Sequence, residues 1–292
     1  MLLPRFAYHR PAGIAEALAL LAEHQDRAAV LAGGTDLLVN LKHKLKNPAV
    51  LVDLAGIPGL AQVEETAGAL RVGPLCSARG LSRDATVRAQ ATALALGAGV
   101  LGSPQVRNRA TVGGNVCNAR PAADMCVPLL ALGASACLRA SEGEREVPLA
   151  EFFLGPGATV RRPTEILVGL QVPAAQAGAG SGYQKLGLRK ALEIALVNVA
   201  AFLTLEKDGK TIAGARVALG SVAPTPILSP GAAAALVGRE AGPAALAQAG
   251  EAAAADCRPI DDHRGSAAYR RDMVAVLTRR ALEAALAQAQ GN

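Results

Sequence analysis

The sequence predicts an α+β protein of two domains, and three observations support this prediction. The first third of the chain alternates apolar runs with a glycine turn and a helical pattern, in the order strand, helix, strand. The second half places two apolar runs before alanine-rich helical stretches, as in a layer of strands covered by helices. Between these parts lies Ala174–Gly182, which has the small, uncharged composition of a flexible linker. We therefore predict domains at residues 1–176 and 177–292.

The first elements indicate a βαβ unit. Gly13–Gln25 has apolar residues at helical spacing and predicts an amphipathic helix. Residues 28–45, AAVLAGGTDLLVNLKHKL, predict a strand, a Gly-Gly turn and a helix opening near Thr35. Thr35 or Asp36 could cap that helix, because either side-chain oxygen can accept its free amide protons. Pro48–Leu54 predicts the next strand.

The rest of the chain follows the same reasoning. Apolar runs and helical spacing predict further elements of the first domain, in chain order: a strand at Leu70–Gly73, a helical region at Ala78–Gly99, a helix at Ala122–Leu132, and strands at 134–140 and Thr164–Pro173. The second domain is predicted to contain strands at Ala195–Leu205 and Thr211–Val222, then two helical stretches, the last at Ala267–Gln290.

Composition excludes several classes of protein. Aromatic residues make up 2% of the chain, with no Trp, so a stacking platform for single-stranded nucleic acid is not expected. The net charge is +6, but the basic residues are scattered, and we predict no nucleic-acid partner. The apolar runs are too short for a membrane span, and no signal peptide is visible. Five cysteines indicate reduced thiols in a cytoplasmic protein.

Two glycine turns are the candidate ligand-binding features. They are Gly33-Gly34 in LAGGTD and Gly113-Gly114 in ATVGGN. Successive backbone amides in such a turn, placed at a helix start, can bind a phosphate without a cationic side chain. Two turns could therefore hold both phosphates of a dinucleotide, although a Gly-Gly pair considered alone is more often a simple tight turn. Neither matches the Rossmann or P-loop glycine pattern.

Five motifs in order carry a resemblance to a known family. They are VLAGGTDL (30–37), QVRNRATVGGN (105–115), PAAD (121–124), EILVGLQVP (165–173) and YQKLGLRKALEIA (183–195). Together they resemble the FAD-binding medium subunit of molybdenum hydroxylases, the family of xanthine dehydrogenase, carbon monoxide dehydrogenase and 4-hydroxybenzoyl-CoA reductase. The resemblance implies a two-part FAD-binding domain of the vanillyl-alcohol-oxidase/PCMH type, with subdomains of about 1–56 and 57–176. A smaller α+β C-terminal domain of the CO dehydrogenase flavoprotein type would follow it.

The resemblance also implies which residues bind the cofactor. Backbone amides of the two turns would hold the FAD pyrophosphate, with side-chain hydrogen bonds from Thr35 and Asn115. Leu101 would pack on a cofactor ring, Asp124 would bond FAD, and Leu167 and Lys185 would border it. The full expected set is Val30, Leu31, Ala32, Gly33, Gly34, Thr35, Asp36, Leu37, Leu101, Thr111, Val112, Gly113, Gly114, Asn115, Asp124, Leu167 and Lys185.

The residues themselves leave alternatives at two of these positions. A carboxylate such as Asp124 can accept hydrogen bonds from ribose or ribityl hydroxyls, or it can cap the helix that it opens. A cation such as Lys185 near a flavin would stabilise the negative charge of the reduced ring, but an isolated lysine is also an ordinary surface residue. Leu192 stands where xanthine dehydrogenase has one of two acidic residues, and Glu193 matches the other. We therefore expect Leu192→Asp to lower the flavin potential.

The cysteines do not predict a metal site. Cys117, Cys126 and Cys137 are spaced unlike the compact patterns of iron–sulfur or zinc sites. The 4-hydroxybenzoyl-CoA reductase subunit carries an inserted cysteine-rich loop for a cluster, and VCNARPAADMCV lacks that insertion. We predict buried thiols and no metal or cluster in this chain.

The function implied by the resemblance is electron transfer. Electrons would pass from a large molybdenum-cofactor subunit through [2Fe-2S] clusters on a small subunit to FAD in this chain, and then to NAD or another acceptor. A dimer of heterotrimers is expected. The alternatives are a stand-alone flavin-dependent reductase or oxidase, and a non-enzymatic assembly homologue. The substrate of the complex is left open, although LAGGTD in place of AGGHS points away from carbon monoxide.

Overall fold

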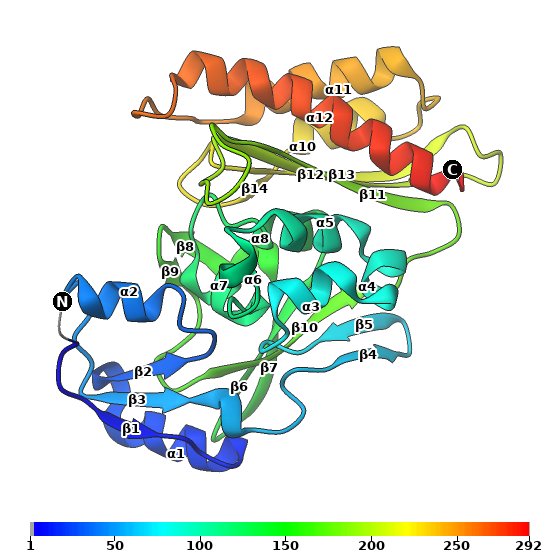
Figure 1. Cartoon of the computed structure of the whole chain (residues 1–292). Coiled ribbons are helices and arrows are strands. Elements are labelled where there is room, and N and C mark those ends of the chain that lie inside the picture. Colours follow the sequence, from blue (N-terminus) through cyan, green and yellow to red (C-terminus); the bar gives the residue numbers. More distant parts are fainter. Residues whose placement is uncertain (1–2, 292) are drawn as a thin grey trace.

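The structure, a computed structural model, describes residues 3–291 and consists of three parts (Figure 1). An N-terminal lobe lies at the lower left, a central body of sheet and helices adjoins it, and a C-terminal layer covers the top of the body. Strands and helices are mixed in every part, which confirms the predicted α+β class.

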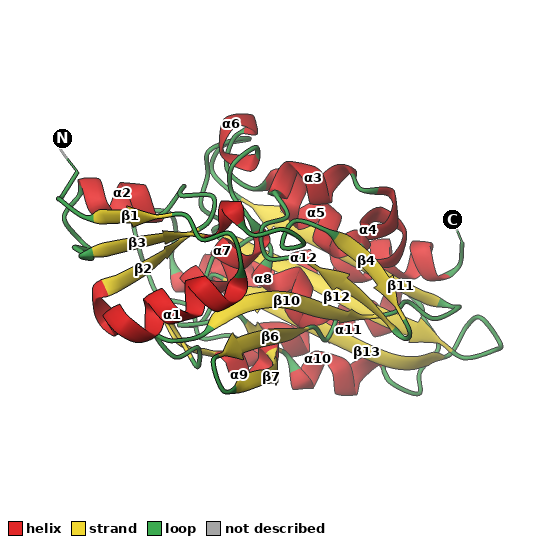
Figure 2. Ribbon diagram, turned by 90° about the horizontal axis from the view of Figure 1, so that it is seen from below, coloured by secondary structure: helices red, strands yellow, loops and turns green. Residues whose placement is uncertain are grey.

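The N-terminal lobe is built on a three-stranded parallel sheet in the order β1-β3-β2 (Figure 2). The predicted βαβ unit is present, with α2 connecting β2 to β3. The sequence did not predict β1, because three residues are too short to form a recognisable pattern. The elements are β1 (Ala7–His9), α1 (Ile14–His24), a 3-10 turn (Gln25–Arg27), β2 (Ala28–Leu31), α2 (Leu37–Lys42), β3 (Val50–Asp53) and a 3-10 turn (Leu54–Gly56).

The body contains a five-stranded antiparallel sheet in the order β4-β5-β10-β6-β7, so its central strand comes last in the chain. Its elements are β4 (Val63–Thr66), β5 (Ala69–Val72), α3 (Ala78–Arg83), α4 (Ala85–Gln90), α5 (Thr92–Val100), α6 (Pro104–Arg107), α7 (Val112–Asn118), α8 (Cys126–Ala131), β6 (Ser135–Ala140), β7 (Gly143–Pro148), α9 (Leu149–Phe152), β8 (Phe153–Gly155), β9 (Ala158–Thr159) and β10 (Ile166–Pro173). The predicted helix at 78–99 is three short helices, since Asp84 and Ala91 interrupt it with extended or irregular backbone.

The C-terminal layer is a four-stranded antiparallel sheet, β11-β12-β13-β14, covered by three helices. Its elements are β11 (Ala179–Leu186), β12 (Val197–Leu205), β13 (Ile212–Gly220), β14 (Ile227–Leu228), α10 (Pro230–Leu236), α11 (Pro243–Asp256) and α12 (Ala267–Ala289). Among residues 3–291, no helix is both long and apolar enough to cross a membrane.

The predicted linker is wrong in its second half. Residues 179–182 belong to β11 and pair with β12. A Cβ atom added at Gly180 or Gly182 would overlap the backbone of α12, at the carbonyls of Ala285 and Ala281 respectively. The small residues therefore let a strand lie directly against a helix. The linker prediction failed because flexible linkers and strands in close backbone contact are both rich in small residues.

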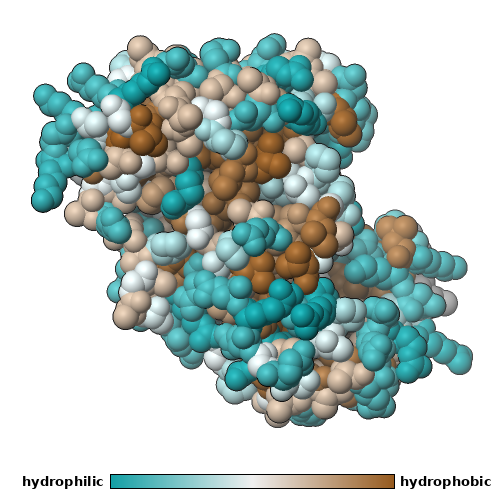
Figure 3. Space-filling model, turned by 180° about the vertical axis from the view of Figure 1, so that it is seen from behind, coloured by the Kyte–Doolittle hydropathy of each residue, from teal (hydrophilic) through white to brown (hydrophobic). Residues whose placement is uncertain are grey.

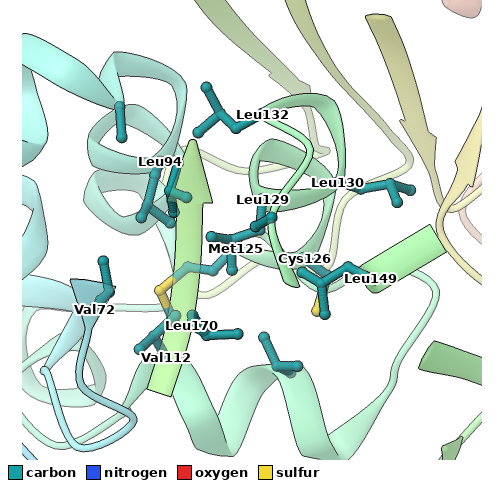
Figure 4. Close-up of a cluster of buried hydrophobic side chains, with 14 of the residues drawn as sticks. Val72, Leu94, Val112, Met125, Cys126, Leu129, Leu130, Leu132, Leu149 and Leu170 are labelled. Atoms are coloured by element: carbon teal, nitrogen blue, oxygen red, sulfur yellow. The ribbon is translucent and has the colours of Figure 1, made fainter. Parts of the chain in front are cut away.

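One hydrophobic core joins the body to the C-terminal layer. Leu129 of helix α8 and Met125, the N-cap residue of that helix, are fully buried together with Leu170 of β10 (Figure 4). The same core includes Ala200 of β12 and Ala218 of β13. The C-terminal sheet thus packs on α8 with one face and on α10 and α12 with the other, which fixes its position beside the cleft described next.

Candidate functional site

A cleft of about 1430 Å³ runs between the three parts of the molecule. Figure 3 shows the N-terminal lobe, at the lower right, separated from the rest of the surface by a recess. The cleft brings the two predicted glycine turns together with Leu101, Asp124 and Leu167. Of the predicted site residues, Leu31, Val112 and Lys185 do not line it.

The first glycine turn offers unbonded backbone amides to the cleft. Among residues 3–291, the amides of residues 33–36 have no hydrogen-bond acceptor within the protein. Helix α2 begins directly afterwards, and neither Thr35 nor Asp36 caps it, contrary to the sequence-based expectation. Gly34 has φ +78°, a conformation that glycine adopts without strain. An uncapped helix start preceded by free amides is a favourable site for phosphate.

The first glycine turn is in direct contact with the segment that leads into the second turn. A Cβ atom at Gly33 would overlap the carbonyl group of Arg109, which lies just before the second turn. The glycine at this position is therefore required by contact between two protein segments, a reason that the sequence alone did not reveal. This contact places the start of α7 beside the start of α2 at the same wall of the cleft.

The amides of the second turn, unlike those of the first, already have acceptors within the protein. The amides of Val112, Gly113 and Asn115 donate to the carbonyls of Cys76 (3.0 Å), Pro74 (2.9 Å) and Thr111 (3.0 Å). The amide of Gly114 donates to Thr111 Oγ1 at 3.1 Å, so Thr111 caps α7. Backbone donors that already have acceptors would have to break these bonds to hold a phosphate.

The second turn instead offers side-chain donors. The Thr111 hydroxyl accepts the bond from Gly114 and keeps its own proton available. Asn115 Oδ1 accepts from the amide of Met125 at 3.1 Å, which fixes the side chain and leaves its NH₂ group without an acceptor among the described residues. Both residues line the cleft, so they can complement the amides of the first turn.

Asp124 is the centre of a buried hydrogen-bond network. Its Oδ2 lies 2.8 Å from Lys185 Nζ, and its Oδ1 accepts from the Tyr183 hydroxyl at 2.8 Å. Asn198 donates in turn to the Tyr183 hydroxyl at 3.1 Å. Burial raises the pKa of Asp124 above its ordinary value, against the opposing effects of Lys185 and Tyr183. Burial and the nearby carboxylate also raise the pKa of Tyr183 well above its ordinary value.

The structure excludes the simpler alternative at each of these two positions. Asp124 does not cap α8, whose N-cap position is Met125. Lys185 is not a solvated surface residue, since its side chain is 11% exposed. Asp124 lines the cleft and Lys185 does not. The lysine therefore contacts the carboxylate that faces the cleft, and its own side chain lies behind that carboxylate.

An apolar turn forms another wall of the cleft. The Leu101 carbonyl accepts from the Arg107 guanidinium at 2.9 Å, and the Gly102 carbonyl accepts from the amide of Leu192 at 3.0 Å. Leu101 and Leu167 are buried, and both line the cleft. Leu192 also lines it, is 58% exposed and has φ +53°. The loop that carries Leu192 is thus attached to the turn that carries Leu101.

Sequence reasoning missed the arginines of the cleft. The lining includes Arg120, Arg161, Arg258, Arg264 and Arg270. Arg258, Arg264 and Arg270 come from the loop after α11 and the start of α12, more than 130 residues beyond the second glycine turn. No local pattern in the sequence could have placed them beside the glycine turns.

The cysteines are free thiols, and four of the five are buried. Burial raises the pKa of Cys76 to about 11 and also raises the pKa of Cys117 and Cys126. Raised values favour the neutral thiol, which is a poor nucleophile and metal ligand. Within residues 3–291, no group of three or more His, Cys, Asp and Glu side chains is placed to hold a metal ion.

Comparison with known families assigns both halves of the chain. Residues 4–175 match the FAD binding domain in molybdopterin dehydrogenase, and residues 182–285 match the CO dehydrogenase flavoprotein C-terminal domain. The fold is thus that of an FAD-binding flavoprotein. The chain belongs to the family of FAD-binding medium subunits of molybdenum hydroxylases, as the sequence motifs indicated.

Individual relatives cover nearly the whole chain. The carbon monoxide dehydrogenase medium chain of Hydrogenophaga pseudoflava is 36% identical and covers 99% of each chain. The xanthine dehydrogenase FAD-binding subunit of Escherichia coli O157:H7 is 32% identical over 98% of this chain and 97% of its own. Among solved structures, carbon monoxide dehydrogenase from H. pseudoflava matches with a TM-score of 0.94 at 36% identity, covering 99% of each chain. Quinoline 2-oxidoreductase from Pseudomonas putida 86 matches with a TM-score of 0.92 at 30% identity, covering 99% of this chain and 100% of its own.

The residues of the cleft fit FAD. The free amides of residues 33–36 suit a diphosphate, because they combine with the positive end of α2. The donors of Thr111 and Asn115 stand beside them, and the carboxylate of Asp124 can accept from sugar hydroxyls. Leu101 and Leu167 provide apolar surface for a ring system.

Proposed function

We propose that this chain holds FAD as the electron-transfer subunit of a molybdenum-containing hydroxylase. When bound, FAD accepts electrons from [2Fe-2S] clusters on a partner subunit and delivers them to NAD or another acceptor. The observation that carries the proposal is the set of unbonded amides at residues 33–36, at an uncapped helix start inside a large cleft.

Each predicted residue has a proposed task in this site. Gly33, Gly34 and the following amides bind the diphosphate, and Thr111 and Asn115 add side-chain donors. Asp124 orients the cofactor by accepting its hydroxyl protons. The remaining cleft-lining members of the predicted set surround the cofactor: Val30, Ala32, Thr35, Asp36, Leu37, Leu101, Gly113, Gly114 and Leu167.

Three predicted residues take supporting tasks. Lys185 holds Asp124 and adds a positive charge behind it, which favours negative charge in the cleft. Leu31 ends the strand that leads into the first turn, and Val112 is fully buried at the start of α7. They position the turns, since neither lines the cleft.

We propose a large molybdenum-cofactor subunit and a small [2Fe-2S] subunit as partners, with two such three-subunit units forming a dimer. The names of the relatives support multi-subunit enzymes, and the described part of this chain holds no candidate metal cluster of its own. The relatives act on carbon monoxide, xanthine and quinoline by their names, so we assign the choice of substrate to the large subunit. Five unpaired cysteines support a cytoplasmic location.

The alternatives separate by experiment. A stand-alone flavin-dependent reductase or oxidase would turn over its substrate when purified alone with FAD, whereas the proposed subunit needs its partners for substrate turnover. A non-enzymatic assembly homologue would stay colourless and resist reconstitution with FAD.

The decisive test is to co-express the chain with its neighbouring large and small subunits and to purify the complex. We expect flavin absorbance that is lost in Gly33→Ala and kept in Gly13→Ala, where an added Cβ meets no atom within 4 Å. A wild-type complex that contains no flavin and cannot be loaded with FAD would refute the proposal.

A further inference from the structure

One face of the C-terminal sheet carries three polar side chains within a largely apolar contact. Tyr183 and Lys185 are two residues apart on β11, so their side chains point to the same face. Asn198 of β12 lies directly opposite Lys185 in the antiparallel register and therefore shares that face. The same face packs on α8 through small residues such as Ala200. The three polar side chains thus form a buried cluster against Asp124, in the turn before α8.

The hydrogen bonds of this cluster run in one direction. The Tyr183 hydroxyl lies 2.8 Å from Oδ1 of Asp124, and an ionised carboxylate only accepts. The single proton of the tyrosine hydroxyl is therefore donated to Asp124. The atom of Asn198 that lies 3.1 Å from the tyrosine oxygen must then belong to its NH₂ group, because that oxygen has no second proton to give. Donation thus passes from Asn198 to Tyr183 and from Tyr183 to Asp124.

Packing alone does not explain an asparagine at position 198. Asn198 is fully buried, and its Oδ1 has no hydrogen-bond partner among residues 3–291. Its neighbour on β13 is Gly220, where an added Cβ would overlap this oxygen, so the glycine leaves room for the amide. Buried polar atoms normally have a partner, and an exception needs an explanation. A leucine has the same branched skeleton without an unpaired oxygen, so the distinctive feature of Asn198 is the donor that it gives to Tyr183.

Two groups of the cluster favour the ionised form of Asp124. Burial raises the pKa of Asp124 above its ordinary value, and Lys185 and Tyr183 act against this effect. On α8, burial raises the pKa of the Cys126 thiol, which therefore stays neutral beside the carboxylate. On α5, the Val100 carbonyl accepts from Lys185 Nζ at 3.4 Å. Tyr183 supports the charge on Asp124 only while its proton points at the carboxylate.

We propose that Tyr183 and Asn198 are positioning residues of the cofactor site. Asn198 orients the tyrosine hydroxyl, and the hydroxyl holds the carboxylate of Asp124 ionised and turned to accept from cofactor hydroxyls. Asp124 lines the cleft, whereas Tyr183 and Asn198 lie behind it, so both act through the carboxylate. The proposal rests on the proposed function of the chain and adds two residues to its site.

The test measures FAD binding by the complex after its flavin has been removed, as a function of pH, from the change in flavin fluorescence. A neutral carboxyl group is a weaker acceptor than a carboxylate, so binding should weaken as pH falls and Asp124 takes up a proton. Tyr183→Phe removes a bond to the charged form and raises the pKa of Asp124, so the weakening should begin at a higher pH than in the native complex. At a pH where the native complex still binds fully, we expect Tyr183→Phe to bind FAD about tenfold more weakly.

Asn198→Leu should move the pH profile in the same direction by a smaller amount, because the tyrosine hydroxyl can still reach Asp124 without its orienting donor. Two substitutions in the same layer are the controls. Tyr269→Phe removes a half-exposed hydroxyl on α12, and Thr278→Val removes another buried oxygen that has no partner in the described part of the chain. Both controls should keep the native affinity and the native pH profile.

An unchanged affinity and pH profile in Tyr183→Phe would overturn the proposal. So would a loss of affinity that is equal at every pH, which is the result expected of a merely structural change. If Tyr183→Phe does not fold, the profile of Asn198→Leu decides, and it must move to higher pH. A native complex that binds no FAD at any pH means that the proposed function has failed. A native complex that binds FAD, with variants that bind it identically, means that only the positioning assignment has failed.

Discussion

Lys185 Nζ lies 2.8 Å from Asp124 Oδ2, and this ion pair connects the C-terminal sheet to the wall of the cleft in the body. Both side chains are about nine-tenths buried. Tyr183, two residues before Lys185 on the same strand, bonds the other oxygen of the carboxylate. One strand of the C-terminal layer therefore determines how Asp124 faces the cofactor site.

Replacing Lys185 with Met should destabilise the protein in a pH-dependent manner. The change leaves Asp124 buried without its cation, so its pKa, already raised by burial, rises further. The ionised carboxylate is then costly at high pH, at about 3–5 kcal/mol, and the cost shrinks as pH falls and the group protonates. Denaturant unfolding at pH 8 and pH 5 measures this difference. The exposed Lys190→Met is the control, and a loss that is equal at both pH values would contradict the prediction.

Gly33→Ala should prevent FAD loading. The new Cβ would collide with the carbonyl of Arg109, and separating the two segments would displace the free amides of the first turn. The flavin content of the purified protein measures the effect, and far-ultraviolet circular dichroism shows whether the fold persists. Gly13→Ala should retain full flavin content, since the added methyl group meets open space.

Gly182→Ala should destabilise the C-terminal layer. Its Cβ would overlap the Ala281 carbonyl and push α12 away from β11. Overpacking of this kind costs about 1–3 kcal/mol. Chemical unfolding compares it with Gly242→Ala, in the same layer, where nothing lies within 4 Å. If residues 179–182 were a flexible linker, the two variants would be equally stable.

Leu192→Asp should lower the midpoint potential of the flavin. A negative charge at the cleft wall disfavours reduction, because reduction adds negative charge to the ring. Asp tolerates the positive φ of this position better than Leu does, so the fold should be preserved. A redox titration against the neutral Leu192→Asn isolates the effect of charge. Equal midpoints for the two variants would show that the charge is not sensed.

Asp262 should contribute to stability above about pH 4 and lose that contribution in acid. Desolvation opposes its ionisation, but hydrogen bonds from the amide of Arg264 and the guanidinium of Arg270 outweigh it and lower the pKa to about 2. Because the folded pKa lies below the unfolded value, the contribution is present above that unfolded value and disappears as pH falls through 2. The difference in unfolding free energy between the wild type and Asp262→Asn should therefore vanish near pH 2. A difference that is constant from pH 7 to pH 2 would refute this account.

The sequence predicted what depends on neighbouring residues. The glycine turns, the βαβ unit and the long apolar strands are local patterns, and all of them are present. Family resemblance then added Asp124, whose role no local pattern could fix. The free amides of the first turn follow from its position before an uncapped helix.

The features that the sequence could not predict depend on contacts between residues that are far apart in the chain. The amides of Val112 and Gly113 are bonded because the carbonyls of Cys76 and Pro74 lie beside them. The glycines of β11 resemble a linker because composition does not show which helix will pack on them. Arg258 and Arg264 reach the cleft only after the C-terminal layer has packed on α8.

The contact of Gly33 with Arg109 has a thermodynamic consequence. The free amides belong to the N-terminal lobe, residues 3–56, and the side-chain donors of Thr111 and Asn115 belong to the body. A ligand that binds both groups must therefore favour the arrangement in which the lobe contacts the body at Gly33 and Arg109. Binding and closure are then linked, and each strengthens the other by the same factor. Loss of flavin should therefore speed hydrogen exchange in β1–β3 more than in the C-terminal layer. The prosthetic group would thus act as part of the architecture as well as an electron carrier.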